Sequence, residues 1–490
     1  MRLNLQVLSA EQIELVHEST LDLLGRRGLT MKAPKALETF RRHGLKTDGG
    51  QVFFSRDVVE KALATAPSAF TLTARDPAKT LTVGRGRPAA LAPCAGVPML
   101  LTEDGLQRPV GVDDFRDMLR LTQTSPTLDL ACSGSLYPSW PRPTAGLYLQ
   151  MLLTLAMTDR PLIGQSEGPE VSAGIIEMVR RALGHDDRPV VVGICNSLSP
   201  MAWDERMLEG LRVYAELGQP VNVSCCAMSG ATSPVSLAGG VLQANCEVLG
   251  GLIYAQLLSP GLPIIYGTTS SIMDMGSMGL ALGAPEYSLL SAGCGQMAAR
   301  YDLPYRGGGG LTDAKVLDAQ AGAESAWNLL LSLGAGASFM LQSVGVLESF
   351  MSASFDKWIF DEEIMAKFRR LERGLTPWPE DLAGVVAEGQ QAGGFLKLKS
   401  TLKSFRSEFR RPVLGDRRSF ESWTKDGGDL RRQAWTEVRR RLAAYEPPTL
   451  APEALAELEA LVERLTGAPP AQDLGPDWAR DLRAGSGLRP

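Results

Sequence analysis

The fold predicted for this chain is decided by residues 263–324, which read PIIYGTTSSIMDMGSMGLALGAPEYSLLSAGCGQMAARYDLPYRGGGGLTDAKVLDAQAGAE. An apolar run over 263–266 ends in a hydroxyl-rich loop, and a helical pattern follows over 285–300. A second short run over 303–306 ends in four glycines and leads into another helical pattern. This order of strand, loop and helix is typical of parallel α/β sheets. In such sheets the loops after the strands carry small-molecule chemistry.

The same alternation starts at Ala89 and repeats eight times. The predicted strands are Ala90–Cys94, Leu128–Cys132, Pro161–Gln165, Pro189–Cys195, Pro220–Cys225, Pro263–Gly267, Pro304–Gly307 and Ala337–Gln342. The helical patterns that follow them are Val112–Thr122, Thr144–Met157, Pro169–Leu183, Trp203–Leu217, Pro234–Leu258, Pro285–Arg300, Lys315–Leu333 and Phe355–Arg373. Eight evenly repeated pairs predict an α/β fold of the (β/α)8 TIM barrel type, because an open doubly wound sheet seldom repeats so regularly.

Five predicted strands begin at or beside a proline, which a strand tolerates at its first position because the missing N–H falls outside the ladder. These residues mark the amino-terminal end of the predicted barrel, and they are Pro161, Pro189, Pro220, Pro263 and Pro304. For the whole chain we predict an N-terminal α+β cap over residues 1–88, the barrel over 89–373, a C-terminal helical extension over 374–466 and a flexible tail over 467–490.

Composition restricts the classes of partner. Of 490 residues 44% are hydrophobic and 21% charged, and the formal charge is −5, so a nucleic-acid partner, which needs a basic face, is not expected. The N-terminus lacks a long apolar run, so we expect no signal peptide, no membrane span and a cytoplasmic location. Seven scattered cysteines indicate buried thiols rather than a disulfide framework. We also expect a homo-oligomer.

Several common catalytic signatures are missing. The only histidines, His17, His43 and His185, fall in predicted helices or surface loops away from strand ends, so we expect no histidine base and no metal held by the chain. The glycines at 307–310 lack the Lys-Ser/Thr of a phosphate loop, and GRGR at 84–87 lacks the context of a dinucleotide site. NAD and ATP chemistry therefore have no support.

Small polar and aromatic groups follow the predicted strands instead. Aromatic faces there can hold a cation, at ~0.5–2 kcal/mol per ring, and Arg306 can pair with a substrate carboxylate. The candidate substrate-binding residues are Tyr137, Trp140, Asn196, Tyr266, Arg306, Gln342, Glu348 and Phe350, with Glu286 and Asp313 from the adjacent motifs. Each has a structural alternative: the rings can pack under loops, Arg306 can pair with Asp302 or Asp313, and the acids can cap helices.

Several motifs of the chain resemble the trimethylamine methyltransferase family, and they occur in the family's order between about residue 8 and about residue 425. They are NSLSP at 196–200, MSGATSPVSL at 228–237, DMGSMGLALGAPE at 274–286, YDLP at 301–304 and GGLTDAKVLDAQAGAE at 309–324.

The resemblance implies a methyltransferase of methanogenesis-type methylamine metabolism, which moves a methyl group from a methylated amine to the cobalt of a corrinoid (cobalamin). That corrinoid is carried by a separate corrinoid-binding protein and is not held tightly by this chain. The reaction needs no general acid, because a quaternary nitrogen leaves as a neutral tertiary amine, and reduced cobalt is the nucleophile. We therefore expect no catalytic side chain, and a barrel mouth that aims the methyl group outward.

The chain departs from the family at two places. Founding members carry pyrrolysine near a loop after the last strand, whereas residues 345–350 here read GVLESF. This departure favours a quaternary amine such as a betaine over trimethylamine. Where the family commonly has histidines in a GGHxL…HT pattern, this chain has GGFL at 393–396 and Ser400-Thr401.

Two other functions stay open at this point. A zinc-dependent thiol methyltransferase could use Cys225 and Cys226 with Cys195 or Cys294, provided that the strand has already broken, because adjacent strand residues face opposite ways. A barrel that binds a quaternary amine without turnover, as a sensor, is the second alternative.

Overall fold

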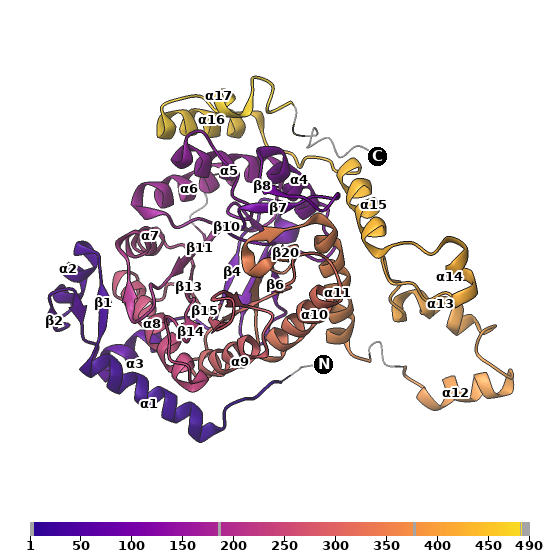
Figure 1. Cartoon of the computed structure of the whole chain (residues 1–490), viewed down its shortest axis with the longest axis horizontal. Helices are drawn as coiled ribbons and strands as arrows, with labels where there is room; N and C mark the ends of the chain where they lie inside the picture. The colour runs from indigo at the N-terminus through magenta and orange to yellow at the C-terminus, as the bar shows by residue number, and fades with distance from the viewer. Residues whose placement is uncertain (1–3, 185–187, 376–378, 481, 483–490) are drawn as a thin grey trace.

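The computed structural model describes residues 4–184, 188–375, 379–480 and 482. Figure 1 shows a central barrel enclosed by helices, with the first three helices at the lower left, α12–α15 of the C-terminal extension on the right, and α16 and α17 at the top beside α5 and α6.

The barrel consists of eight short parallel strands, as the sequence predicts. They are β6 (Ala90–Leu91), β9 (Ala131–Cys132), β10 (Leu162–Gly164), β11 (Val191–Asn196), β13 (Val221–Cys225), β15 (Ile264–Thr268), β18 (Tyr305–Gly308) and β19 (Phe339–Leu341). The sheet runs β6-β19-β18-β15-β13-β11-β10-β9. It closes between β9 and β6, where the N–H groups of Asp129 and Leu130 both donate to the carbonyl of Leu91, at 2.9 and 3.1 Å.

Prolines begin several of these strands without disturbing the ladder. Proline has no N–H but keeps its carbonyl, and the carbonyls of Pro161, Pro220, Pro263 and Pro304 accept from neighbouring strands at 2.9–3.1 Å. The predicted position of these prolines at the amino-terminal end of the barrel is confirmed.

Eight helices surround the barrel, one after each strand: α4 (Val112–Gln123), α5 (Pro143–Met157), α6 (Gly168–Ala182), α7 (Glu205–Glu216), α8 (Leu237–Leu258), α9 (Pro285–Arg300), α10 (Ala319–Gly334) and α11 (Phe355–Arg373). Within the described ranges α8 is the one helix long and apolar enough to cross a membrane. Because 83% of its most apolar window is buried inside the fold, α8 is accounted for as a core helix.

The N-terminal residues form α1 (Ala10–Arg26), β1 (Leu29–Met31), α2 (Pro34–Arg42), β2 (Thr47–Asp48), β3 (Gln51–Val52), α3 (Arg56–Thr65), β4 (Ala69–Leu72), the short helix η1 (Pro77–Lys79) and β5 (Leu81–Gly84). Helix α1 begins with a capping box formed by Ser9 and Gln12. The β4–β5 hairpin closes the amino-terminal end of the barrel, where Phe70 and Leu72 pack against interior residues such as Ile163. Chemistry is therefore confined to the opposite end.

Short strands that the sequence did not reveal brace the loops at that opposite end. They are β7 (Met99–Leu101), β8 (Gln107–Pro109), β12 (Ala202–Trp203), β14 (Met228–Ser229), β16 (Ser271–Met273), β17 (Leu280–Ala281), β20 (Val346–Leu347) and β21 (Ser352–Ala353), with the short helix η2 (Glu348–Phe350) between the last two. They form two small sheets between loops, β20-β21-β7-β8 and β14-β16-β17, whereas β12 pairs with β1 of the N-terminal segment.

The C-terminal extension contains α12 (Leu382–Gln391), α13 (Lys399–Glu408), α14 (Phe420–Asp426), α15 (Leu430–Ala443), α16 (Pro452–Thr466) and α17 (Ala471–Leu474). Part of the predicted flexible tail, residues 481 and 483–490, lies outside the described residues. The described part of that tail packs on the fold, because Trp478 is buried and its indole N–H donates to Glu459 at 3.1 Å.

Candidate functional site

A cavity of about 300 Å³ opens at the carboxyl ends of the barrel strands, and every strand or the loop after it contributes to its wall. Five of the predicted site residues line it: Tyr137, Asn196, Arg306, Gln342 and Phe350. They come from the loops after β9 and β19, from the last residue of β11 and from β18. The remaining five, which are Trp140, Tyr266, Glu286, Asp313 and Glu348, lie elsewhere.

The predicted position of Tyr266 at the barrel mouth is wrong. Ile265 packs in the barrel interior, so Tyr266, the next residue along β15, faces outward to the surrounding helices. Its side chain is fully buried, and its hydroxyl donates to Asn245 Oδ1 of α8 at 3.0 Å. The ring therefore belongs to the layer between barrel and helices.

Trp140 and Glu286 also lie outside the cavity, where they contribute to the packing and to a helix end. The Trp140 ring packs against Gly146 of α5 so closely that an added Cβ at that glycine would lie 2.2 Å from it. Glu286 lies in the first turn of α9, where a carboxylate interacts favourably with the helix dipole. The structure thus places both outside the cavity and contradicts their predicted location.

Asp313 and Glu348 hold loops instead of lining the cavity. Asp313 accepts the backbone N–H groups of Leu282 and Gly283 at 2.8 and 2.9 Å and also accepts the hydroxyl of Ser349. Glu348 accepts from the Gln107 amide and the Ser352 hydroxyl, both at 2.8 Å. Their contribution to the site is indirect, because they fix the segment that carries Phe350.

That segment has an unusual backbone. Glu348, Ser349 and Phe350 have φ values of 52°, 48° and 79°, in the left-handed region that non-glycine residues seldom adopt, and Gln342 has a φ of 51°. The N–H groups of Glu348 and Ser349 donate to backbone carbonyls after β18, at 2.9 and 3.0 Å. Backbone strain of this kind gathers at functional sites, where surrounding contacts maintain it. Here it turns Phe350 to the cavity.

Arg306 supplies a buried positive charge to the cavity wall. Its guanidinium donates to the Thr268 carbonyl at 3.0 Å and to Gln342 Oε1 at 2.7 Å, while its Nε finds no acceptor in the part of the chain that the structure describes. Within the described residues no carboxylate pairs with it, because Asp302 pairs with Arg85 and Asp313 binds the loops. Burial lowers the pKa of Arg306 from its ordinary value. A bound anion would offset this cost of desolvation.

Asn222 is a second donor in the wall that the sequence analysis missed. It lies on β13 and is fully buried, and its Nδ2 has no hydrogen-bond partner among the described residues. Its Oδ1 accepts from Ser224 at 3.2 Å. The signal that could have revealed it is the alternation Val221, Asn222, Val223, Ser224, in which polar residues recur on one face of a buried strand.

A carboxylate also lines the cavity. Glu167, after β10, lines the cavity and accepts from Arg206 at 2.6 Å. Burial raises the pKa of Glu167, although its side chain retains 25% exposure. Tyr137 stands nearby in the loop after β9, and burial raises its pKa to about 12, so the ring carries a neutral phenol. A buried cation and a more exposed carboxylate therefore share one cavity.

A buried glutamate fixes the loop that follows β11. Glu247 of α8 accepts the Ser199 hydroxyl at 2.7 Å, the Met201 N–H at 2.8 Å and the Cys225 thiol at 3.1 Å. This network explains why the loop after Asn196 is rich in serine, and it was not predicted from the sequence.

The structure gives the zinc alternative no support. Cys225 is buried against Glu247, whereas Cys226 is exposed in the cavity, so the two thiols face apart. Across the described ranges no three His, Cys, Asp or Glu side chains gather as a metal site. His17 is buried against the Tyr301 hydroxyl at 3.1 Å, and His185 lies outside the described residues.

Gly267 leaves the space in which the two polar side chains of β13 lie. A Cβ at this position would lie 2.0 Å from Ser224 Oγ and 2.6 Å from Asn222 Oδ1. We expect Gly267→Ala to lower the free energy of unfolding by about 1–3 kcal/mol through overpacking. Chemical denaturation measures this. Gly25→Ala is the matched control, because its Cβ would make an ordinary 3.6 Å contact; equal stability of both variants would contradict the close packing at Gly267.

Comparison with known proteins identifies relatives over nearly the whole chain. A family model described as trimethylamine methyltransferase matches residues 2–468. The chain is 37% identical over 462 residues to a glycine betaine methyltransferase of Desulfitobacterium hafniense strain Y51, covering 93% of this chain and 96% of that protein. It is 31% identical over 460 residues to a proline betaine:corrinoid methyltransferase of Eubacterium limosum, covering 90% and 94% of the two chains.

A solved structure has a similar fold. The monomethylamine methyltransferase of Methanosarcina barkeri superposes with a TM-score of 0.50 at 11% identity, over 89% of this chain and 93% of that chain. At this identity the likeness supports the barrel fold alone.

Proposed function

The chain belongs to the trimethylamine methyltransferase family, and from this premise we propose that it transfers a methyl group from a quaternary amine bearing a carboxylate, such as a betaine, to the corrinoid of a separate protein. The observation that carries the choice of substrate is Arg306, a buried guanidinium in the cavity wall without a carboxylate partner among the described residues.

The cavity suits a zwitterion. The substrate carboxylate would accept from Arg306 and from Asn222 Nδ2, two buried groups of the cavity wall whose donors are not fully used by the described residues. The quaternary nitrogen would then lie toward Tyr137, Phe350 and Glu167, whose rings and carboxylate favour a cation. Trimethylamine has no carboxylate to occupy the polar wall, so buried donors would stay unpaired in its complex.

This pose also serves the chemistry. In the transfer one N–CH₃ bond breaks, its electron pair stays on nitrogen as a neutral tertiary amine, and reduced cobalt of the partner's corrinoid supplies the electron pair of the new bond to carbon. No proton moves, which fits a cavity without a histidine among its lining residues. The task of this chain is to hold the carboxylate inside so that a methyl group faces the open mouth.

The departures from the family pattern fit the same proposal. The segment where founding members carry pyrrolysine corresponds here to the loop that supplies Phe350, an aromatic ring. Neither Phe395 nor Ser400, at the family's histidine positions, lines the cavity, because both lie in the C-terminal extension.

Isothermal titration with a panel of amines tests the substrate class. We expect glycine betaine to bind at least ~10-fold more tightly than tetramethylammonium, because only the betaine adds a charged hydrogen bond worth about 1.5–3 kcal/mol. We expect no measurable binding of trimethylamine. Equal affinity for betaine and tetramethylammonium would contradict the role given to Arg306. Tight binding of betaine without any methyl transfer would favour the sensor alternative.

A further inference from the structure

Cys226 is the one cysteine of this chain whose side chain solvent reaches. All seven cysteines lie within the described ranges, and the other six are buried. Cys226 directly follows β13 and lines the cavity at the barrel mouth, where its Sγ lies 3.9 Å from the Thr269 carbonyl oxygen. Because oxidation or alkylation of a thiol needs access, a reagent that enters the cavity would modify Cys226 selectively.

The cavity around Cys226 has the properties of an anion site. Arg306 lines the same cavity and is only 3% exposed, and its Nε has no acceptor within the described ranges. Asn222 also lines the cavity, and its buried Nδ2 lacks a partner in the same ranges. Burial lowers the pKa of Arg306, and a thiolate at Cys226 is among the charges that act against this shift. An anion formed on the sulfur would therefore meet donors that are already in place.

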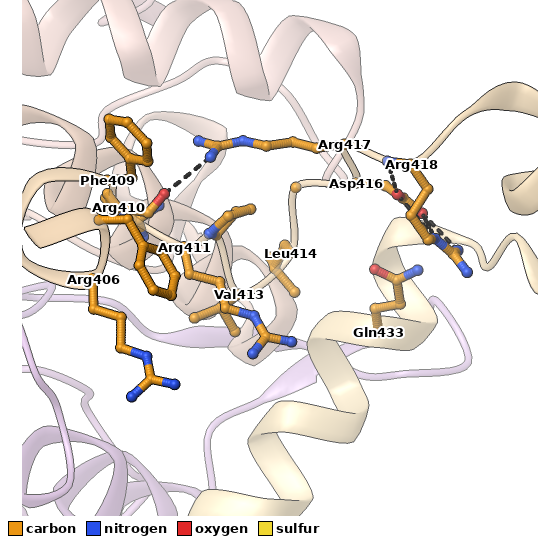
Figure 2. A pocket seen from close by; sticks show the side chains of 13 residues that line it. Arg406, Phe409, Arg410, Arg411, Val413, Leu414, Asp416, Arg417, Arg418 and Gln433 are labelled. Atoms are coloured by element: carbon orange, nitrogen blue, oxygen red, sulfur yellow. Dashed lines mark hydrogen bonds and ion pairs between the residues drawn. The ribbon is translucent and has the colours of Figure 1, made fainter. Parts of the chain in front are cut away.

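The arginines of the C-terminal extension have no such thiol beside them. A hollow of about 920 Å³ in that extension is lined by five arginines, and its described lining includes no cysteine. Figure 2 shows Arg406 and Arg411 of the hollow without a dashed contact, whereas Arg418 pairs with Asp416. Both Arg406 and Arg411 are exposed, so water screens their charge. An accessible thiol and a buried arginine therefore meet at the barrel mouth and not in this hollow.

We propose that Cys226 is a site of reversible oxidation by peroxides, and that its sulfenate takes the place of the substrate carboxylate and so inactivates the chain. With hydrogen peroxide, the thiol sulfur attacks one oxygen, the S–O bond forms and the O–O bond breaks. The sulfur is oxidised and the peroxide reduced, and the thiol proton leaves with the second oxygen as water. The sulfenic acid gives its proton to water, and the sulfenate accepts from Arg306 and Asn222.

The oxidation is reversible because the other six cysteines are buried and none of them is accessible to form a disulfide with Cys226. A small thiol that enters the cavity attacks the sulfur of the sulfenic acid, and water leaves. A second thiol then reduces the mixed disulfide and restores Cys226. The effect on the substrate rests on the proposed function: a carboxylate would have to bind beside a like charge, at donors that the sulfenate already occupies.

Alkylation tests the position of the thiol without any amine. Iodoacetate and iodoacetamide both form an S–C bond with release of iodide, but only iodoacetate carries a carboxylate for Arg306 to bind. Arg306→Gln should therefore lower the ratio of the iodoacetate rate to the iodoacetamide rate about 10-fold or more at Cys226. Arg411→Gln is the matched control, because it removes an arginine without a dashed contact in Figure 2 and should leave this ratio unchanged. Mass spectrometry of the Cys226 peptide measures both rates.

Hydrogen peroxide tests the effect on binding. After treatment, mass spectrometry should find one added oxygen on Cys226, and isothermal titration should show glycine betaine bound at least ~10-fold more weakly. Tetramethylammonium, which has no carboxylate, should bind no more weakly than before, and dithiothreitol should restore the affinity for betaine. Whatever affinity Cys226→Ser has before treatment, peroxide should leave it unchanged. Cys226→Asp, which places a permanent carboxylate beside Arg306, should bind betaine weakly without peroxide.

Peroxide that weakens betaine binding equally in the wild type and in Cys226→Ser would overturn the proposal. So would oxidised Cys226 with unchanged affinity for betaine, or a preference for iodoacetate that persists in Arg306→Gln. If no untreated form of the protein bound an amine, the proposed function would fail. A ratio of alkylation rates that falls in Arg306→Gln and not in Arg411→Gln would even then support the anion site that Cys226 shares with Arg306.

Discussion

Arg306→Gln should lower kcat/KM for glycine betaine roughly 150-fold, an effect of about 3 kcal/mol. The variant removes a charged donor from the carboxylate of the substrate while keeping a polar side chain beside Gln342. Arg306→Lys retains the charge but loses the planar fork, so we expect an intermediate loss of about 10-fold. Steady-state kinetics of methyl-corrinoid formation measure both.

The binding of tetramethylammonium separates this effect from general damage to the fold. Because that cation has no carboxylate, its dissociation constant should be the same for wild type and Arg306→Gln. Arg85→Gln serves as the matched arginine control, since Arg85 is paired with Asp302 far from the cavity wall. If Arg306→Gln had the same kcat/KM for glycine betaine as the wild type, Arg306 would not bind the substrate carboxylate.

Breaking the buried ion pair between Lys357 and Asp361 should have a large effect on stability. Lys357 and Asp361 of α11 are both fully buried and pair at 2.5 Å, and Lys357 also donates to the Gly310 carbonyl at 3.1 Å. Asp361 accepts the Gly345 N–H at 2.8 Å, so the pair joins the loops after β18 and β19. Lys357→Met leaves a buried carboxylate unpaired, and we expect a loss of about 3–5 kcal/mol in the free energy of unfolding at pH 8.

The loss should depend on pH. Burial raises the pKa of Asp361 to about 6 even with Lys357 beside it, and removal of the lysine raises that pKa further. A carboxyl whose pKa is higher in the folded than in the unfolded state destabilises the fold when it ionises. The deficit of Lys357→Met should therefore be small near pH 4 and grow as the pH rises above about 6.

Chemical denaturation at pH 5 and pH 8 tests this prediction. The double variant Lys357→Met/Asp361→Leu should recover most of the lost stability, because it removes both buried charges at similar volume. A deficit of Lys357→Met that is the same at both pH values, or a double variant less stable than the single one, would contradict the assignment.

The barrel could be predicted from the sequence because the residues that mark its strands lie beside those strands in the sequence. Prolines directly before several strands, such as Pro263 before β15, and glycines near strand ends, such as Gly267 within β15, show where those strands lie. Asn196 could be placed at the mouth because it ends β11, and Arg306 because it lies within the short strand β18, close to the glycines that follow. The short strands that brace the mouth loops could not be predicted, because two- or three-residue pairings leave no periodic pattern.

The direction in which a side chain points was harder to predict from the sequence. Tyr266 was placed in the mouth because it lies near a strand end, but one residue of register turns a side chain to the other face of the sheet. Phe350 reaches the cavity through three successive left-handed residues, a conformation that depends on Asp313 and other distant partners rather than on local preference. Asn222 was missed because it lies within a strand and not at its end.

Transfer of an isotopic label shows whether the protein moves a methyl group from a carboxylate-bearing quaternary amine to cobalt. The protein is incubated with glycine betaine labelled with ¹³C in its N-methyl groups, together with reduced cobalamin, and both products are quantified by NMR. We expect equal amounts of ¹³C-methylcobalamin and dimethylglycine, with no methylcobalamin from labelled trimethylamine. Methylcobalamin from trimethylamine but not from betaine would contradict this expectation, as would the absence of methylcobalamin from every quaternary amine that binds.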